Sequence, residues 1–358
     1  MKLDKLFKLV VEKQASDLFL RAGAVPHIRI HGKLELLDFP AITKEEILRI
    51  SDFLLASDVR KNIFNEKQDI DFIHQEPEVG RFRINLFFQR GSPALVARYV
   101  TDNVLTFEDL NLSAEICRQF CSESRGLVLV CGPAGSGKST TIASMIQYIS
   151  ANEEKHIVTM EDPIEFLFKD RKSIINQREI GIDVPSYPSA LRHVTQQSPD
   201  IIYIGTIRDE PTMKAAISAA ELGVLVMSTF HTVNAVQTID RIVNFFPPYL
   251  HSEVRMQLSL LLKGVMSMRL IPRKDGKGRI PACETMVVTP TIARLIREGA
   301  ISQIQSFIEE GELFGMQSFK KSLVKLVKAN LVNEADARYL SDSKDEFNLE
   351  LKGIRRVR

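Results

Sequence analysis

The most informative residues of this chain form a glycine-rich run that ends in a lysine and a serine, GPAGSGKST at 132–140. An apolar run at 127–131 precedes it, and a helix-like stretch at 140–149 follows. In a strand–loop–helix setting, glycines let successive backbone N–H groups converge on a phosphate, and the helix N-terminus adds partial positive charge. The run predicts a phosphate-binding loop made of Gly132, Pro133, Ala134, Gly135, Ser136, Gly137, Lys138, Ser139 and Thr140.

Two side chains of this loop have defined tasks in such motifs. Lys138 is expected to reach the β- and γ-phosphates, and the Ser139 hydroxyl to ligate Mg²⁺. The alternative is a chance glycine turn before a helix, to which the full pattern in this context leaves roughly one chance in fifty. The chain is therefore predicted to bind a nucleoside triphosphate, ATP with Mg²⁺, or to descend from a protein that did.

Phosphoryl transfer also needs a group that orients or deprotonates water and cations for the developing charge. Such groups belong at the carboxyl ends of strands, beside the nucleotide. Apolar runs at 156–160, 201–205 and 224–229 predict three further buried strands. The polar segments after them are Glu161-Asp162-Pro163-Ile164-Glu165, Thr206-Ile207-Arg208-Asp209 and Phe230-His231-Thr232.

Each polar segment has a plain structural alternative. Acidic turns commonly cap helices, and a lone histidine is more often structural than catalytic. Three polar clusters in register with one phosphate loop nevertheless favour functional roles for Glu161 and His231.

The elements that must position these residues fall into regions of different pattern. Helical spacing at 3–13 and 44–55, with alternating runs at 17–20, 27–33, 80–87 and 95–100, predicts a small α+β domain over residues 1–100. A linker is expected at 101–106. Alternating strands and helices then predict an α/β domain with a mostly parallel sheet at 107–290. The expected helices are 212–221, 235–243, 252–269 and 316–329, with residues 291–358 as a C-terminal helical subdomain.

Composition limits the remaining possibilities. With 358 residues, 44% hydrophobic and 26% charged residues, the chain reads as an ordinary globular protein of two domains. A net charge of +2 gives no reason to expect nucleic acid as a partner. We find no signal peptide and no apolar stretch that would span a bilayer, so a cytoplasmic protein without membrane insertion is expected. The four cysteines form no C-x-x-C pair and are expected to be buried thiols.

The order of segments resembles a known family. GPAGSGKSTT, TMEDPIEF (159–166), INQREIG (175–181), PDIIYIG (199–205) and STFHT (228–232) are similar to the motifs of the type IV pilus retraction ATPases, the PilT/PilU family of the type II/IV secretion ATPase superfamily. SDLFL and GRFRINLFFQR resemble that family's PAS-like domain, while RIVNFFP and GMQSFKKSL continue the match. The segment 335–349 looks closer to the PilU branch. The absence of a four-cysteine zinc set is typical of the retraction side rather than of pilus extension ATPases.

The resemblance implies a PAS-like domain followed by a RecA-like P-loop NTPase core. It implies a homohexameric ring at the cytoplasmic face of the inner membrane, with the platform protein of the pilus base and a paralogous motor ATPase as partners. By the same resemblance Glu161 and Glu165 match the acidic box, Asp200 begins the Walker B strand and His231 matches the histidine box. The arginines Arg81, Arg83 and Arg98 are implied as phosphate contacts, which suits an always-charged planar guanidinium.

The sequence departs from the family where hydrolysis is expected. The Walker B strand should end in Gly-Glu, and here reads Gly205-Thr206. Threonine is no base at neutral pH, and loss of a general base costs about 10²–10⁴-fold in rate. A Leu-Arg expected before the strand reads Thr195-Gln196, and Leu222 and Val224 replace a threonine and a histidine. Glu161 is the candidate substitute base.

Three functions remain open on this basis. The first is an ATP-binding motor subunit of pilus retraction and twitching motility, with weak hydrolysis. The second is a non-hydrolysing accessory or regulatory ring subunit that partners a competent motor. The third is an assembly ATPase of a related secretion system.

Overall fold

The computed structural model describes residues 3–30, 33–100 and 104–354. The chain divides into two compact units, the first comprising Met1–Asn103 with Pro163–Leu167 and the second Val104–Asp162 with Phe168–Arg358. Residues 101–103 of the expected linker lie outside the described part. The boundaries expected at residues 100, 106 and 290 stay predictions.

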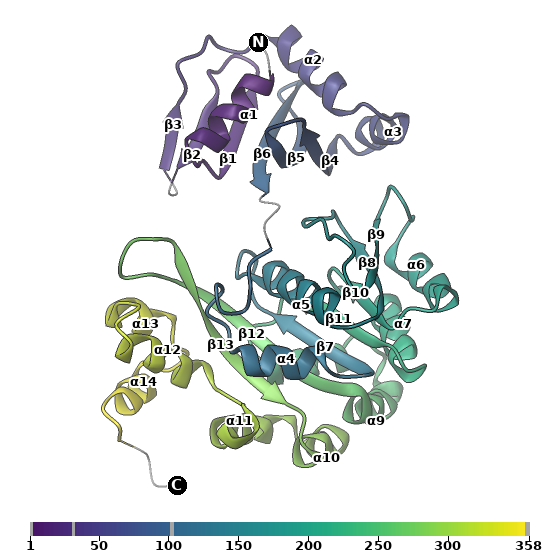
Figure 1. Cartoon of the computed structure of the whole chain (residues 1–358), viewed down its shortest axis with the longest axis vertical. Helices are drawn as coiled ribbons and strands as arrows, with labels where there is room; N and C mark the ends of the chain where they lie inside the picture. Colours follow the sequence, from purple (N-terminus) through teal and green to yellow (C-terminus); the bar gives the residue numbers. More distant parts are fainter. Residues whose placement is uncertain (1–2, 31–32, 101–103, 355–358) are drawn as a thin grey trace. The chain divides into compact units, whose positions relative to one another are not determined.

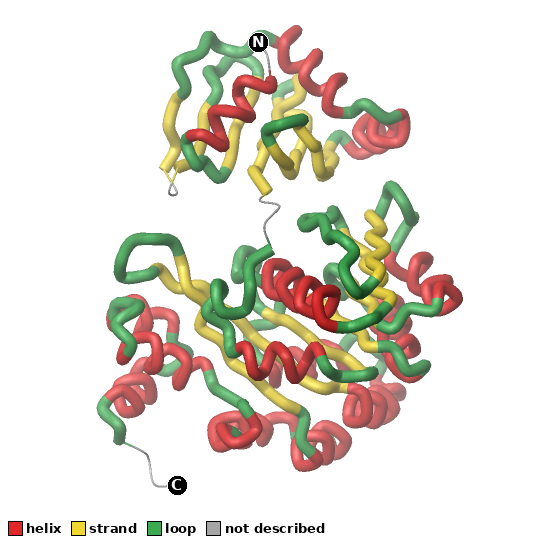
Figure 2. The backbone as a smooth tube through the Cα atoms, viewed as in Figure 1, coloured by secondary structure: helices red, strands yellow, loops and turns green. Residues whose placement is uncertain are grey.

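The first unit is an antiparallel sheet of six strands in the order β3-β2-β1-β6-β5-β4. Its strands are β1 (Asp17–Arg21), β2 (His27–Ile30), β3 (Lys33–Leu36), β4 (Asp69–Glu76), β5 (Gly80–Gln89) and β6 (Ser92–Val100). Its helices are α1 (Leu3–Glu12), α2 (Lys44–Leu54) and α3 (Asp58–Lys67). Figure 2 shows these helices against the sheet. The α+β class is as predicted, whereas α3, β3 and β4 were not anticipated.

Alternation along the strands separates an apolar face from a polar one. On β5, Phe82, Ile84 and Leu86 are buried in a core shared with α1 and α2. Phe7 of α1 stacks on Phe82 with ring centroids 4.0 Å apart. Because side chains alternate along a strand, the residues that flank these three, Arg81 and Arg83 among them, belong to the opposite face.

The second unit is built on a sheet of seven strands in the order β13-β12-β7-β11-β10-β8-β9. The strands are β7 (Gly126–Cys131), β8 (His156–Glu161), β9 (Ile174–Glu179), β10 (Ile201–Ile204), β11 (Leu225–Phe230), β12 (Leu262–Pro272) and β13 (Arg279–Val287). All neighbours pair in parallel except β12 and β13. The predicted, mostly parallel sheet is thus confirmed.

Helices cover both faces of this sheet (Figure 1). Helices α4 (Ala114–Cys121) and α5 (Lys138–Asn152) pack on one face, where Val128, Ile142 and Met227 share a core. The other face carries α6 (Tyr187–Val194), α7 (Glu210–Glu221), α8 (Ala235–Val243), α9 (His251–Leu261) and α10 (Pro290–Glu298). Both faces are covered, which explains why the central strands are apolar throughout.

The helix expected at 252–269 is wrong in its second half. The helix ends at Leu261, and the chain continues as β12 between β7 and β13. Leucine and methionine favour helix, but pairing on both sides overrides this propensity. Gly264 lies at the register shift of β12, where a Cβ would come within 2.2 Å of the Phe120 ring of α4.

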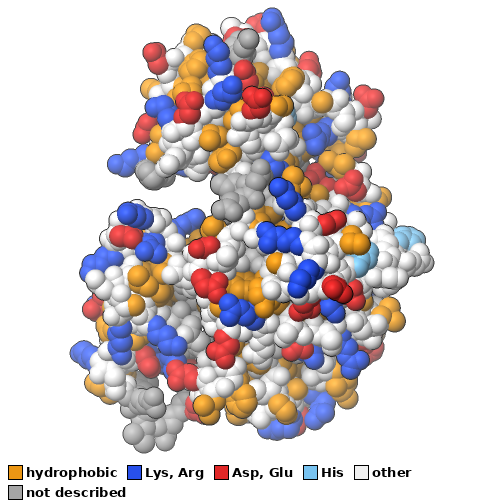
Figure 3. Space-filling view, viewed as in Figure 1, with side chains coloured by type: hydrophobic (Ala, Val, Ile, Leu, Met, Phe, Trp, Pro, Cys, Tyr) orange, Lys and Arg blue, Asp and Glu red, His pale blue; other side chains and the backbone are white. Residues whose placement is uncertain are grey.

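Three C-terminal helices build a smaller core on β12 and β13: α12 (Phe319–Lys328), α13 (Glu334–Leu340) and α14 (Lys344–Leu351). Helix α11 (Ile304–Glu310), which precedes them, packs into the large core of the second unit. Phe319 and Leu323 are buried in the smaller core with Ile280, while Leu326 is partly buried. The apolar side of α12 is therefore mostly core. On the face of the second unit visible in Figure 3, basic and acidic side chains are interspersed.

Candidate functional site

The phosphate loop joins β7, which lies inside the sheet, to the start of α5. Lys138 is the first residue of α5 and is buried, with its Nζ donating to the carbonyl oxygens of Gly132 at 2.8 Å and Pro133 at 2.9 Å. The ammonium therefore already faces the hollow of the loop. This is the place from which it would reach a phosphate.

Gly132 is the residue on which the shape of the loop depends. Its φ is +146°, and a Cβ built on it would lie 2.5 Å from the carbonyl oxygen of Met268 on β12 and 2.5 Å from Ser136 Oγ. No side chain fits there, so the first glycine of the motif is required by contact as well as by conformation.

The start of α5 carries amide donors that no described side chain caps. Gly137 is its N-cap, with φ +95° and no side-chain cap hydrogen bond. Ser136 Oγ is buried and has no hydrogen-bond partner among the described residues. Uncapped helix amides attract anions. The loop thus fits a phosphate group, and the Ser139 hydroxyl, one residue into the helix, would hold Mg²⁺.

Glu161 is the last residue of β8 and is only 5% exposed. Its Oε1 accepts hydrogen bonds from Thr159 Oγ1 at 2.7 Å and from Gln177 Nε2 at 3.1 Å. Two donors on one oxygen favour the ionised, fixed carboxylate that a general base requires. Glu161 therefore lies where the sequence predicts it.

Sequence reasoning missed Gln177, although the run INQREIG was recognised. Gln177 is directly opposite Thr159 in the pairing of β8 with β9, so both side chains lie on one face. Its Nε2 donates to Glu161, and its Oε1 accepts from the Phe168 amide at 2.9 Å. Gln177 thereby links the Glu161 carboxylate to the backbone of Phe168 through two hydrogen bonds. The pairing of β8 with β9 was needed to find it.

Thr206 follows β10 and is turned towards the strand ends. Its Oγ1 donates to the Gly205 carbonyl at 2.7 Å and lies 3.0 Å from Thr229 Oγ1. Thr229 Oγ1 also hydrogen bonds to the Gly205 carbonyl. The Thr206 hydroxyl is thus part of a local hydrogen-bond network between the ends of β10 and β11.

His231 follows β11 and is exposed. Partial burial lowers its pKa, and the nearby cations Lys138 and Arg208 lower this pKa further. The ring is therefore neutral at physiological pH. The charges that act on His231 therefore come from the phosphate loop and from the segment after β10, and all three segments follow the carboxyl ends of parallel strands in one sheet.

Glu165 has its charged partner in the first unit. The segment Pro163–Leu167 belongs to that unit, and Glu165 Oε1 accepts from Arg83 Nη1 at 2.8 Å. The same guanidinium holds both oxygens of Asp71. Arg81, which is buried, donates to the carbonyl oxygens of Ile164 and Glu165.

Arg98 is the third arginine that the sequence singles out. It lies opposite Arg83 in the pairing of β5 with β6. Its Nε donates to the buried Asp17 at 2.9 Å, while 64% of its side chain remains exposed. The role of these arginines in phosphate contact stays a prediction.

The cysteines are free, and Cys117, Cys121 and Cys131 are buried. Burial raises the pKa of Cys117 to about 12 and that of Cys131 to about 11, which keeps both thiols protonated. Among the described residues, no group of three or more His, Cys, Asp or Glu side chains could hold a metal ion.

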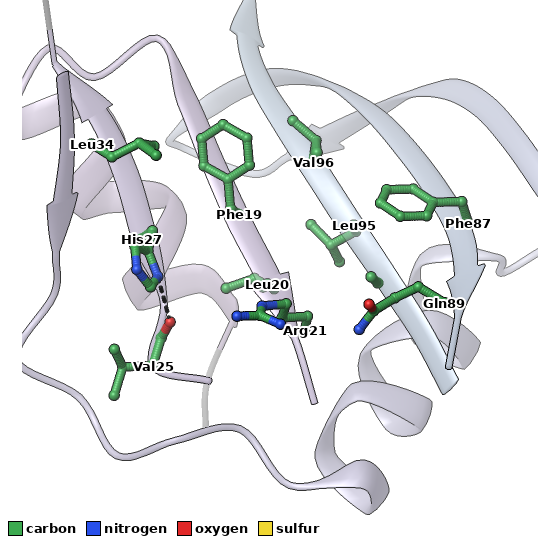
Figure 4. A pocket seen from close by; sticks show the side chains of 11 residues that line it. Phe19, Leu20, Arg21, Val25, His27, Leu34, Phe87, Gln89, Leu95 and Val96 are labelled. Carbon is green, nitrogen blue, oxygen red and sulfur yellow. Dashed lines mark hydrogen bonds between the residues drawn. The ribbon is translucent and has the colours of Figure 1, made fainter. Parts of the chain in front are cut away.

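A pocket of about 300 Å³ lies on the first unit, over β1, β2, β5 and β6 (Figure 4). Its walls are mainly apolar, with Phe19, Phe87 and Leu34 among them. His27 also lines it, and its Nδ1 donates to the Val25 carbonyl oxygen at 2.8 Å. None of the residues predicted to act on the nucleotide lines it.

Comparison with known proteins agrees with this geometry. The model of the type II/IV secretion system protein family matches residues 2–338. The chain belongs to this family. It is 36% identical to the type IV pilus ATPase PilU of Pseudomonas aeruginosa, over 98% of this chain and 92% of that protein. It is 39% identical to the type IV pilus retraction ATPase PilT of the same organism, over 97% and 100%.

A solved structure of the same family resembles the whole chain. The crystal structure of the pilus retraction motor PilT with bound ADP matches with a TM-score of 0.88 and 41% identity, over 97% of this chain and 98% of that one. The predicted family and fold class are therefore confirmed. Within the described ranges, no helix has both the length and the apolar character needed to cross a membrane.

Proposed function

We propose that this chain is an ATP-binding motor subunit of a type IV pilus retraction machine, with slow ATP hydrolysis. The observation that carries the proposal is that the Lys138 loop and the held carboxylate of Glu161 lie at the carboxyl ends of β7 and β8, two parallel strands of one sheet with β11 and β10 between them. Such an arrangement supplies binding and a base to one nucleotide. The ADP in the solved PilT relative supports the same site.

Each group then has a defined task. Backbone amides of the loop and Lys138 bind the β- and γ-phosphates, and Ser139 would hold Mg²⁺, which neutralises charge on the phosphates. Glu161 takes a proton from a water molecule while the oxygen of that water attacks the γ-phosphorus. The bond from that phosphorus to the β–γ bridging oxygen breaks, and ADP and phosphate leave. The neutral His231 is available as a hydrogen-bonding group beside Lys138.

Thr206 is the reason for proposing slow turnover. A hydroxyl that serves the Gly205 carbonyl and Thr229 does not accept a proton from water at neutral pH. Removal of a general base costs about 10²–10⁴-fold. Glu161 would recover part of that loss, which leaves a weak ATPase.

The remaining parts of the proposal rest on the relatives. We propose a homohexamer at the cytoplasmic side of the inner membrane, acting on the platform protein at the pilus base, with a paralogous motor ATPase as a further partner. Of the three arginines, Arg98 is the best suited to reach phosphate, because most of its side chain is exposed whereas Arg83 is held by two carboxylates.

Nucleotide binding and phosphate release, measured on the same purified protein, test the proposal. We expect saturable binding of ATP, turnover well below the roughly one per second of an ordinary enzyme, and loss of both in Lys138→Ala. Thr206→Glu should raise turnover by about two to four decades if the missing base limits the rate. Fast turnover that survives Glu161→Gln but is lost in Lys138→Ala would refute the assignment of the base.

A second candidate is an accessory ring subunit that binds ATP and acts by contact with a competent motor. The engagement of Thr206 within the strand ends favours it. Binding without measurable phosphate release, unchanged by Thr206→Glu, would select this function over the motor.

A further inference from the structure

A buried carboxyl group that no motif singles out contacts the helix that follows His231. Glu284 lies within β13, and its Oε1 accepts the backbone amide of Ala235, the first residue of α8, at 2.9 Å. An amide in the first turn of a helix has no acceptor inside that helix, so Glu284 supplies one. Burial raises the pKa of Glu284, but an oxygen that can accept this amide is present in either protonation state.

The first turn of α8 is also joined to the chain around His231. Thr238 Oγ1 lies 2.6 Å from Thr232 Oγ1 and hydrogen bonds to it, and Thr232 is the residue after His231. Thr238 Oγ1 also lies 3.3 Å from Cys131 Sγ, and Cys131 directly precedes Gly132 of the phosphate loop. The start of α8 therefore contacts both the His231 segment and the base of the phosphate loop.

The second oxygen of Glu284 contacts the C-terminal part of the chain. Gln305 of α11 donates from Nε2 to Glu284 Oε2 at 3.3 Å. Thr285, the next residue of β13, exchanges two backbone hydrogen bonds of 2.7 and 3.1 Å with Gln317, which lies just before α12. The carboxyl group of Glu284 thus lies between the start of α8 and the segments that carry α11 and α12.

A pocket beside this contact leaves one side of the helix start without close packing. It has a volume of about 530 Å³, and Asn234, Val236 and Gln237 around the start of α8 line it together with Glu284 and Gln305. Because no side chain fills this space, a hydrogen bond rather than packing positions the start of α8 on this side.

We propose that Glu284 is a positioning residue of the nucleotide site, which links α11 to the start of α8 and thereby fixes the segment that carries His231. The inference rests on the proposed ATP hydrolysis. Glu284 acts through α8, without contact to the nucleotide. A shift of α11 would change the position of His231 along the same path.

The first test compares two substitutions of Glu284. Glu284→Gln keeps an oxygen that can accept the Ala235 amide, whereas Glu284→Leu has a similar size and no acceptor. We expect kcat for ATP to fall about tenfold in Glu284→Leu, the effect of losing one hydrogen bond, with KM unchanged. In Glu284→Gln kcat should stay near the wild-type value. Equal falls in the two variants, or no fall in either, would overturn the inference.

The second measurement does not need turnover. Burial, Lys138 and Arg208 lower the pKa of His231 from its ordinary value of 6.5. If the segment is released in Glu284→Leu, an NMR titration should show this pKa moving up towards 6.5, while Glu284→Gln keeps the wild-type value. An unchanged pKa of His231 in folded Glu284→Leu would contradict the proposed role.

Ser343→Ala is the matched control. Ser343 is the N-cap of α14 in the same unit, and its side chain accepts the Glu346 amide. The variant therefore loses a hydrogen bond at a helix start that has no link to α8. It should change neither kcat nor the pKa of His231. Equal changes in Ser343→Ala and Glu284→Leu would mean that any lost helix cap has this effect, and the inference would be wrong.

Gln305→Met tests the link to α11 and leaves Glu284 in place. It should lower kcat by about threefold, because the hydrogen bond that it removes is long, at 3.3 Å. In the Glu284→Leu background it should have no further effect. Additive losses would mean that the two residues act separately, which contradicts the inference.

Gln305→Met also decides the matter if Glu284→Leu does not fold. In that case, an unchanged kcat together with an unchanged pKa of His231 in Gln305→Met overturns the inference. Failure of the proposed function shows differently, as wild-type phosphate release no greater than that of Lys138→Ala. The titration of His231 then still tests the role of Glu284.

Discussion

Replacement of Gly132 by alanine tests the geometry of the phosphate loop most sharply. The residue has φ +146°, a region that side-chain-bearing residues avoid. The new Cβ would also lie 2.5 Å from the Met268 carbonyl oxygen, which belongs to the backbone of β12. Neither the loop nor the strand can move without disturbing the pairing of β12 with β7.

The magnitude follows from these two effects. Holding a residue in a sparsely populated backbone conformation costs about 1–3 kcal/mol. Inserting an extra carbon into a packed site costs a further ~1–3 kcal/mol. We therefore expect Gly132→Ala to lower the free energy of unfolding by about 2–6 kcal/mol, a large part of the roughly 5–15 kcal/mol of a typical domain.

Gly135→Ala is the matched control. Gly135 belongs to the same loop and has φ +73°, but a Cβ on it would meet nothing within 4 Å. Only the left-handed conformation then matters, at about 1–2 kcal/mol. Urea unfolding of the two variants without nucleotide compares them directly. Equal destabilisation of both would refute the close approach of Gly132 to β12.

Three further outcomes are expected. Gln177→Leu should lower ATP turnover about tenfold, because Glu161 loses a donor, while calorimetry shows unchanged ATP affinity; equal loss of affinity would assign Gln177 to binding instead. The imidazole of His231 should titrate below pH 6.5 by NMR, and its pKa should rise in Lys138→Ala, which removes one of the cations that lower it. Burial raises the pKa of Glu284, so its ionisation opposes folding as pH rises above its unfolded pKa of about 4.3. In urea unfolding, the free energy of unfolding of Glu284→Gln minus that of the wild type should therefore be larger at pH 8 than at pH 5. A difference that does not change with pH would contradict this.

The phosphate loop and the central strands were predictable because their information is local. Continuous apolar runs gave β7, β8, β10 and β11 within about one residue at each end. The loop motif specifies its own conformation through its glycines. The family, too, followed from motifs that are contiguous in sequence.

Features that depend on which strands pair, or on how helices pack, could not be predicted from the sequence. Residues 262–269 read as the end of a helix, because leucine and methionine favour helix and only the contacts with β7 and β13 make them a strand. Gln177 acquires its task from the register of β9 against β8. The contact of Glu284 with the start of α8 depends on how that helix packs against β13.

The acidic box illustrates a third limit. Glu161 and Glu165 are close in sequence, and both match the acidic box of the family. In the structure they have different partners, because Thr159 and Gln177 donate to Glu161 whereas Arg83 donates to Glu165. Spacing in the sequence alone does not reveal these partners.

Calorimetry with Mg²⁺ and a non-hydrolysable ATP analogue tests the central claim most directly. The account predicts saturable heat for the wild-type protein and its loss in Lys138→Ala, with both proteins showing the same circular dichroism spectrum. The absence of binding to the wild type, or equal binding to the two proteins, would contradict it.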